Sequence, residues 1–114
     1  MEDTQGKTTV SPEVLTTISR FAALEVPGVS RLAPVAGGVN RLFHRGTEEG
    51  DRIEAKDNTV FVDLFLILKE NVNIREVSRN VQQNVARSIQ EMVGMEIGEV
   101  NIHIEEIDFE ENGS

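Results

Sequence analysis

The stretch VFVDLFLILKENVNIREVSRNVQQNVARSIQEMVGMEIGEVNIHI, residues 60–104, decides the fold of this chain. Its beginning alternates between two sets of side chains, because successive residues of a strand point to opposite faces of a sheet. One set is wholly apolar and consists of Val60, Val62, Leu64, Leu66 and Leu68. The pattern therefore predicts a strand with one face against a core.

A capped helix and a second strand follow in the same stretch. Asn73 stands at the N-cap position with Glu76 three residues later, and Gly94 suits a left-handed stop. The apolar stripe between them consists of Ile74, Val77, Val81, Val85, Ile89 and Met92. Apolar and polar residues then alternate over 100–105, which predicts a strand. A right-handed crossover would lay this strand parallel to the first.

The remainder of the chain predicts a second helix and shorter strands. Ser11 and Pro12 suit a helix start, and Pro27-Gly28 suits its end. The expected buried stripe of this helix is Val14, Leu15, Ile18, Phe21 and Ala22. Short strands are predicted at 7–10, 29–35 and 52–56. The strand at 52–56 is expected to pair with the strand at Val60 through a turn at 57–58. Residues 44–51 are predicted to form an exposed loop. Together these elements predict an α+β two-layer sandwich, with two main helices packed on one face of a mixed four- to five-stranded sheet.

The length and the charge distribution indicate one acidic domain. The chain has 114 residues, and we expect a single domain over 7–108, a disordered N-terminus over 1–6 and an acidic disordered tail over 109–114. The net charge is −9, and seven acidic residues with no Lys or Arg lie from Glu96 onward. Such an acidic end disfavours binding to nucleic acid or to anionic lipid, because like charges repel.

The composition also limits where the protein works. There is no cysteine, which excludes disulfides, thiolate metal sites and thiol nucleophiles. The start MEDTQGK lacks the features of a secretory signal, and the longest apolar run, 60–68, is too short to span a bilayer. We therefore expect a cytoplasmic protein whose association with a membrane is peripheral or made through another protein.

The sheet face opposite the helices is the candidate binding surface. Phe61, Asp63, Phe65 and Ile67 fall on it, with His103 expected nearby on the second strand. Soluble monomers rarely leave aromatic patches uncovered, so the face is a candidate for self-association or for docking of a partner. The alternative is that residues 35–50 fold back over it. Asp63 is either a solubilising charge on this face or a partner for His103 or for another protein.

No motif for catalysis or cofactor binding is present. His44 and His103 are the only histidines, and neither has another metal ligand at a recognised spacing. The glycines lack the spacing of a phosphate-binding loop, and a nucleophile elbow is missing. We therefore expect a protein that is not an enzyme and that has no catalytic residues, no cofactor and no metal.

Several segments in order resemble the alkaline shock protein family of Gram-positive bacteria. The resembling segments are VSPEVL (10–15), AALEVPGV (22–29), GGV (37–39), VFVDLFLIL (60–68), VNIREVSRNVQQNV (72–85) and VNIHI (100–104). The resemblance runs from about Gly6 to Asp108. Each segment alone is weakly specific, whereas their order and spacing together are more so.

The resemblance implies a non-enzymatic, self-associating protein linked to cell-envelope stress. Family members are held at the inner face of the cytoplasmic membrane by a membrane-anchored partner that carries a related domain. Other members that are similar at NIHI (101–104) are linked to fatty-acid synthesis and to control of acetyl-CoA carboxylase. The alternative implied function is thus regulation of such a lipid-synthesis enzyme by direct contact.

Overall fold

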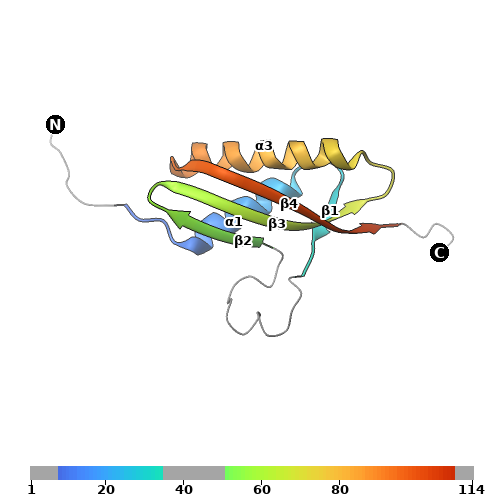
Figure 1. Ribbon diagram of the computed structural model, residues 1–114, viewed down its shortest axis with the longest axis horizontal. Helices are drawn as coiled ribbons and strands as arrows, with labels where there is room; N and C mark the ends of the chain where they lie inside the picture. Colours follow the sequence, from blue (N-terminus) through green and yellow to red (C-terminus); the bar gives the residue numbers. More distant parts are fainter. Residues whose placement is uncertain (1–7, 35–50, 110–114) are drawn as a thin grey trace.

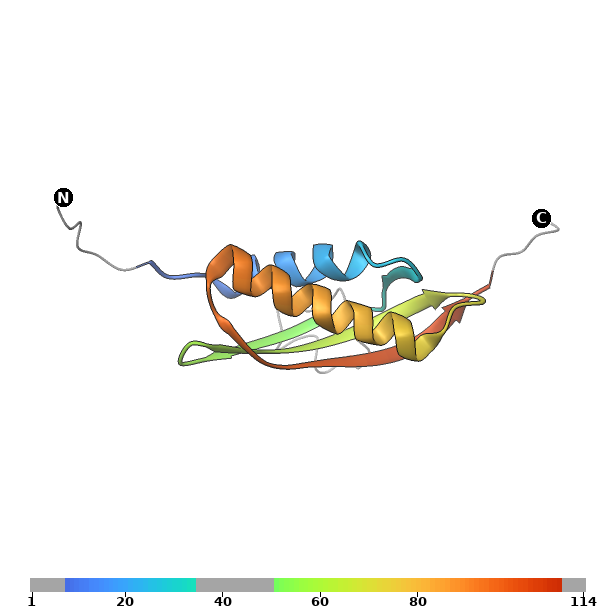
Figure 2. The same ribbon diagram turned by 90° about the horizontal axis from the view of Figure 1, so that it is seen from above.

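The computed structural model describes residues 8–34 and 51–109, and these form two helices and four strands. In chain order the elements are α1 (Pro12–Leu24), β1 (Val29–Leu32), β2 (Asp51–Lys56), β3 (Thr59–Lys69), α3 (Ile74–Val93) and β4 (Glu96–Asp108). Both helices lie on the same face of the sheet (Figures 1 and 2). The predicted α+β two-layer fold is confirmed. The predicted disordered N-terminus at 1–6 and residues 110–114 of the predicted tail lie outside the described residues.

The long strand β3 organises the sheet. β4 runs parallel to β3 along its whole length, from the pair Thr59 and Glu96 to the pair Lys69 and Asp108. β2 and β1 are both antiparallel to β3, β2 against residues 59–64 and β1 against residues 66–68. Since β4 occupies one edge of β3, β2 and β1 must share the other edge, one after the other. The predicted parallel pairing, and with it the mixed sheet, is confirmed.

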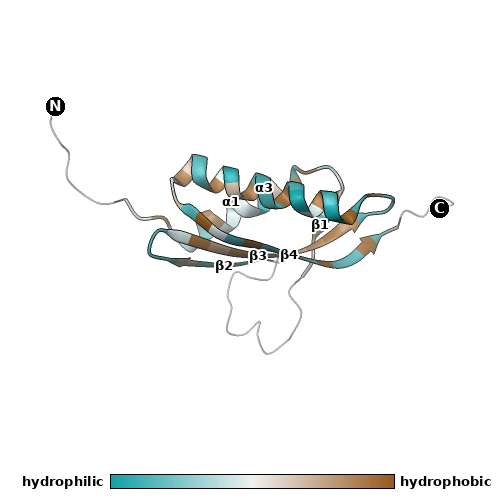
Figure 3. Ribbon diagram, turned by 45° about the horizontal axis from the view of Figure 1, so that its top comes forward, coloured by the Kyte–Doolittle hydropathy of each residue, from teal (hydrophilic) through white to brown (hydrophobic). Residues whose placement is uncertain are grey.

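The core lies between the sheet and the helices. The alternating set predicted for β3, from Val60 to Leu68, is fully buried, with each side chain 0% exposed. It packs against buried residues of the two helices, and Figure 3 shows the polar sides of the helices turned away from the sheet. The helix residues in this core are Leu15, Ile18, Ala22, Ala23, Val77, Val81, Val85 and Ile89. Burial of this apolar surface is the main stabilising contribution to the fold.

Four residues of the predicted helix stripes are exposed instead. On α1, Val14 is 45% and Phe21 64% exposed; on α3, Ile74 is 46% and Met92 69% exposed. The predictions for these four were wrong. Ile74 and Met92 lie in the first and last turns of α3, and α1 buries small residues such as Ala22 and Ala23 in place of Phe21. Helical periodicity marks an apolar side, but the width of the contact with the sheet decides how much of that side is buried.

The ends of α3 have the predicted chemistry. The amide of Glu76 donates to Oδ1 of Asn73 over 2.9 Å, and Gly94 ends the helix with a φ of 75°. Both are standard helix terminations, because they satisfy backbone groups that have no partner within the helix. Ser11 takes the N-cap position of α1 next to Pro12, but its side chain makes no capping hydrogen bond.

Three predictions about the shorter strands need correction. Residues 8–10 are not a strand, and Val10 is instead a partly buried residue packed against the core. β1 ends at Leu32, so the predicted strand at 29–35 is too long within the described residues. Asp51, the last residue of the predicted exposed loop, is the first residue of β2 and is only 1% exposed. The rest of that loop lies outside the described residues.

Gly28 is a position where only glycine fits. Its φ is 104°, and a Cβ added there would lie 2.7 Å from Cγ2 of Val77 on α3. Gly28→Ala is therefore expected to destabilise the protein more than Gly94→Ala, because Gly94 has a φ of 75° but no atom within 4 Å of an added Cβ. The loss for Gly94→Ala should be about 1 kcal/mol, from the backbone conformation alone. Urea denaturation of the two variants measures both effects, and equal losses would contradict the steric explanation.

Candidate protein-binding face of the sheet

The face of the sheet opposite the helices is called the outer face here, and β3 sets its layout. Phe61, Asp63 and Phe65 project onto it from β3, because they alternate with the buried core residues. The antiparallel register brings Arg52 of β2 opposite Asp63. No helix or strand among residues 8–34 and 51–109 lies over this face (Figure 2).

A bulge in β4 brings the polar residues of that strand beside the aromatic ones. The offset between β3 and β4 changes between the pairs Val60–Ile97 and Phe61–Glu99, so Gly98 is the extra residue. From there Asn101 pairs with Asp63, and His103 pairs with Phe65. A Cβ on Gly98 would lie 2.5 Å from Cε2 of Phe61. The bulge residue is thus small enough for the Phe61 ring to lie against the backbone.

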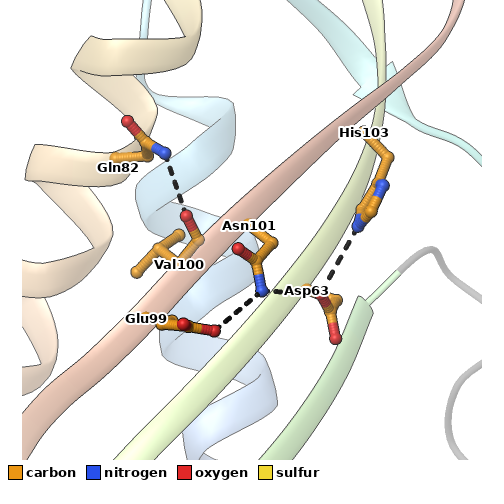
Figure 4. Close-up of polar contacts among 6 residues, drawn as sticks. All are labelled: Asp63, Gln82, Glu99, Val100, Asn101 and His103. Carbon is orange, nitrogen blue, oxygen red and sulfur yellow. Dashed lines mark hydrogen bonds and ion pairs between the residues drawn. The ribbon is translucent and has the colours of Figure 1, made fainter.

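Asp63 is the centre of a small polar cluster (Figure 4). Its Oδ1 accepts a hydrogen bond from Nδ2 of Asn101 over 3.1 Å, and Nε2 of His103 lies 3.4 Å from the same oxygen. Nδ2 of Asn101 also lies 3.4 Å from an oxygen of Glu99. The Asp63 side chain is 31% and the His103 side chain 44% exposed. The cluster can therefore exchange its contacts for contacts with another molecule.

Phe65 joins the polar cluster to β2. Its ring stacks on the imidazole of His103 with a centroid distance of 4.5 Å and an interplanar angle of 12°. The guanidinium carbon of Arg52 lies 5.8 Å from the centroid of the same ring, within the range of a cation–π contact. Aromatic residues and arginine are the residue types most enriched in protein interfaces. The composition of this face therefore suits protein binding.

Four of the five predicted interface residues lie together on the outer face. Phe61, Asp63, Phe65 and His103 are all partly or well exposed. Ile67 is different, because it is only 2% exposed. The expectation that Ile67 is an exposed surface residue was wrong. Strand alternation assigns a residue to a face, but it does not predict how deeply that face is covered at each position.

The sequence reasoning missed the roles of Arg52 and Gly98. Arg52 could have been placed from the predicted hairpin, because a turn at 57–58 sets residue 52 opposite residue 63. The sequence gives no comparable signal for a bulge at Gly98, since glycine also occurs commonly in turns and loops. The bulge, and so the pairing of Asn101 with Asp63, became visible only in the structure.

The outer-face cluster is separate from the hollows of the helix layer. In residues 8–34 and 51–109 there is no group of three or more His, Asp or Glu side chains able to hold a metal ion. Two hollows lie on the helix layer, one beside Glu25 and Asn84 and one beside Val14 and Met92. Neither includes Asp63 or His103. The cluster on the outer face thus lies away from both hollows.

The two described helices differ from membrane-spanning helices. Within residues 8–34 and 51–109, neither α1 nor α3 combines the length and the apolar character that a membrane span needs. α3 has the length of such a span, but polar and charged side chains occupy one side of it.

Known proteins similar to this chain include one from Bacillus subtilis and one from Streptococcus pyogenes. YqhY of Bacillus subtilis is 32% identical over 112 residues, which cover 96% of this chain and 83% of YqhY. Spy1535 of Streptococcus pyogenes is 31% identical over 109 residues, covering 90% of this chain and 79% of Spy1535. Among solved structures, a MamM-CTD variant matches with a TM-score of 0.53 and 12% identity, over 83% of this chain and 98% of that chain. At this identity the structural match reports a shared fold only.

The match to a family covers almost the whole chain. The sequence model of the alkaline shock protein 23 family, described as having a cell envelope-related function, matches residues 1–109. This range includes all the described elements and the outer face. It also agrees with the motif resemblance found in the sequence. The chain therefore belongs to the alkaline shock protein 23 family.

Proposed function

We propose that this protein is a non-enzymatic scaffold of the cell-envelope stress response, which self-associates through the outer face of its sheet. The observation that carries the proposal is the pair of phenylalanines, Phe61 and Phe65, on a face that no described helix or strand covers. Their rings lie beside Arg52 and His103, so the face combines apolar area with polar groups that can pair across an interface. The family's cell envelope-related function supports a role at the envelope.

The proposal includes a cytoplasmic location and an indirect attachment to the membrane. The protein would be held at the inner face of the cytoplasmic membrane by a membrane-anchored protein with a related domain. Support comes from the helices, neither of which suits a membrane span within the described residues. The acidic charge of the chain, −9 overall, also disfavours direct binding to anionic lipid.

The double substitution Phe61→Gln and Phe65→Gln tests the proposed self-association. Removing both rings takes away the apolar centre of the face, so we expect oligomers to be replaced by monomers. Sedimentation velocity over a range of protein concentrations measures the change. Circular dichroism and urea denaturation check that the variant still folds, which is expected because both side chains are only partly buried.

A third phenylalanine provides the matched control. Phe21 is 64% exposed on α1, on the helix side of the molecule. Phe21→Gln should leave the oligomeric state unchanged, since the proposed interface is on the opposite side. Wild-type association of the Phe61 and Phe65 double variant would rule out the outer face as the interface.

Isolation of the full chain with its partners from the native host tests the membrane attachment. Recovery of a membrane-anchored protein with a related domain would support the scaffold. Loss of this protein from the Phe61 and Phe65 double variant would show that the outer face also holds the anchor, and its retention would show that another surface does. Recovery of acetyl-CoA carboxylase subunits without such an anchor would instead support the regulation of a lipid-synthesis enzyme.

A further inference from the structure

The outer face separates positive from negative charge across its width. On the β1 and β2 side, the side chains that share this face include Arg31, Arg52 and Lys56, with Glu54 as the only acid among them. On the β4 side the face carries acidic residues and no Lys or Arg. These acidic residues are Glu96, Glu99, Glu106 and Asp108. Phe61 and Phe65 lie between the two sides, on β3.

This charge separation limits how two copies can meet face to face. Two sheets that pack in this way keep their strand directions within about 30° of each other. A two-fold axis in the interface, running along β3, places the β1 and β2 side of each copy over β4 of its partner. A two-fold axis running across the strands places β4 over β4 instead. The first arrangement brings opposite charges together, and the second brings like charges together.

We infer that the partner on the outer face is a second copy of this chain, related by a two-fold axis parallel to β3. This inference rests on the proposed self-association and adds the geometry of the dimer. Under this axis, a β1 or β2 residue of one copy faces the β4 residue of the other copy that pairs with the same residue of β3. Lys56 and Glu96 both pair with Thr59, so each Lys56 faces the partner's Glu96. Every such pair occurs twice, because a two-fold interface is self-complementary.

The same axis brings together a second opposite pair at the other end of β3. Arg31 and Glu106 both pair with Ile67, so Arg31, whose Nε lies 3.9 Å from Asp108 of its own chain, also faces the partner's Glu106. One contact is repulsive: Glu54 and Glu99 both pair with Phe61, so Glu54 faces the partner's Glu99. Two contacts between opposite charges and one contact between like charges still favour this axis. An axis across the strands, centred at Asp63, instead sets Arg52 against Arg52 and Glu96 against Glu106, and both of these contacts are repulsive.

Two single charge reversals test this geometry. Lys56→Glu places two negative charges at each of the two equivalent contacts, and Glu96→Lys places two positive charges there. Each variant alone should dimerise about tenfold more weakly than the wild type, because a favourable exposed pair is replaced by a repulsive one at two places. Both residues pair with Thr59 in the sheet and not with Phe61 or Phe65, so the substitutions leave the apolar centre itself unchanged.

The deciding measurement is an equimolar mixture of the two variants. In a mixed dimer, the glutamate introduced at position 56 of one chain faces the lysine introduced at position 96 of the other, and the second contact keeps the wild-type pair. The mixture should therefore regain the wild-type dimer affinity, measured by sedimentation velocity with one variant fluorescently labelled. Rescue is expected only if positions 56 and 96 face each other between copies.

The outcomes separate this inference from the function on which it rests. Wild-type affinity of the single variants, or a mixture no tighter than either variant alone, would overturn the two-fold axis along β3. If the Phe61 and Phe65 double variant is monomeric in that case, self-association through the outer face still holds and only the geometry fails. If that double variant dimerises like the wild type, both the proposed function and this inference fail.

Discussion

Leu64→Ala is expected to lower the free energy of unfolding by about 3 kcal/mol, within the range known for leucine truncation in a core. Leu64 is 0% exposed and lies in the middle of β3. Its strand neighbours are Asp51 on β2 and Ile102 on β4, so the cavity would open where the sheet is paired on both sides. A domain of this size has only about 5–15 kcal/mol of total stability, which makes the loss large.

A second leucine serves as the control for this prediction. Leu24 is 44% exposed in the last turn of α1. Leu24→Ala should change the free energy of unfolding by about 0.5 kcal/mol or less, because little apolar surface is lost from the core. Urea denaturation of the wild type, Leu64→Ala and Leu24→Ala gives the comparison, with the same dependence of the unfolding free energy on urea concentration for all three. Similar losses for Leu64→Ala and Leu24→Ala would show that β3 does not form the centre of the core.

Arg20→Met is expected to destabilise the protein by about 3 kcal/mol, the lower end of the range for breaking a buried ion pair. Nε of Arg20 on α1 lies 3.8 Å from Oδ1 of Asp51 on β2. The Asp51 side chain is 1% exposed and the Arg20 side chain 28% exposed. Methionine keeps the apolar stem of Arg20, so the variant removes chiefly the positive charge beside a buried carboxylate.

Two further variants identify the cause of this loss. Adding Asp51→Leu to Arg20→Met should recover most of the lost stability, because the buried negative charge is then also gone. The exposed pair of Arg31 and Asp108 is the control, with side chains 55% and 44% exposed over 3.9 Å. Arg31→Met should cost about 1 kcal/mol or less. Equal effects of Arg20→Met and Arg31→Met on thermal and urea unfolding would contradict a special role for the buried pair.

Most of the candidate binding face was predictable from the sequence. The alternation in β3 assigns Phe61, Asp63 and Phe65 to the face opposite the core, and the right-handed crossover sets β4 beside β3. The proximity of His103 to this face follows from those two rules. Its individual contacts do not follow, because a parallel pair fixes its register through packing and bulges and not through a tight turn.

The errors in the prediction have a common physical origin. Phe21 was expected to be buried and Ile67 exposed, yet Phe21 is 64% and Ile67 2% exposed. Periodicity identifies the side of an element on which a residue lies. The exposure of the residue also depends on how far neighbouring elements extend over that side, and this depends on parts of the chain distant in sequence.

The sequence by itself determined that residues 60–104 form a strand, a helix and a second strand, because side-chain period and helix caps are local properties. The structure extends the second strand, predicted at 100–105, to Glu96–Asp108. Only the tertiary structure decided that β1 and β2 share one edge of β3 and that α1 brings Arg20 beside the buried Asp51. It also decided, through the extra residue Gly98, that Asn101 and His103 both reach Asp63. These contacts join residues 31 to 40 positions apart, and their register depends on how the whole sheet packs, which no local pattern encodes.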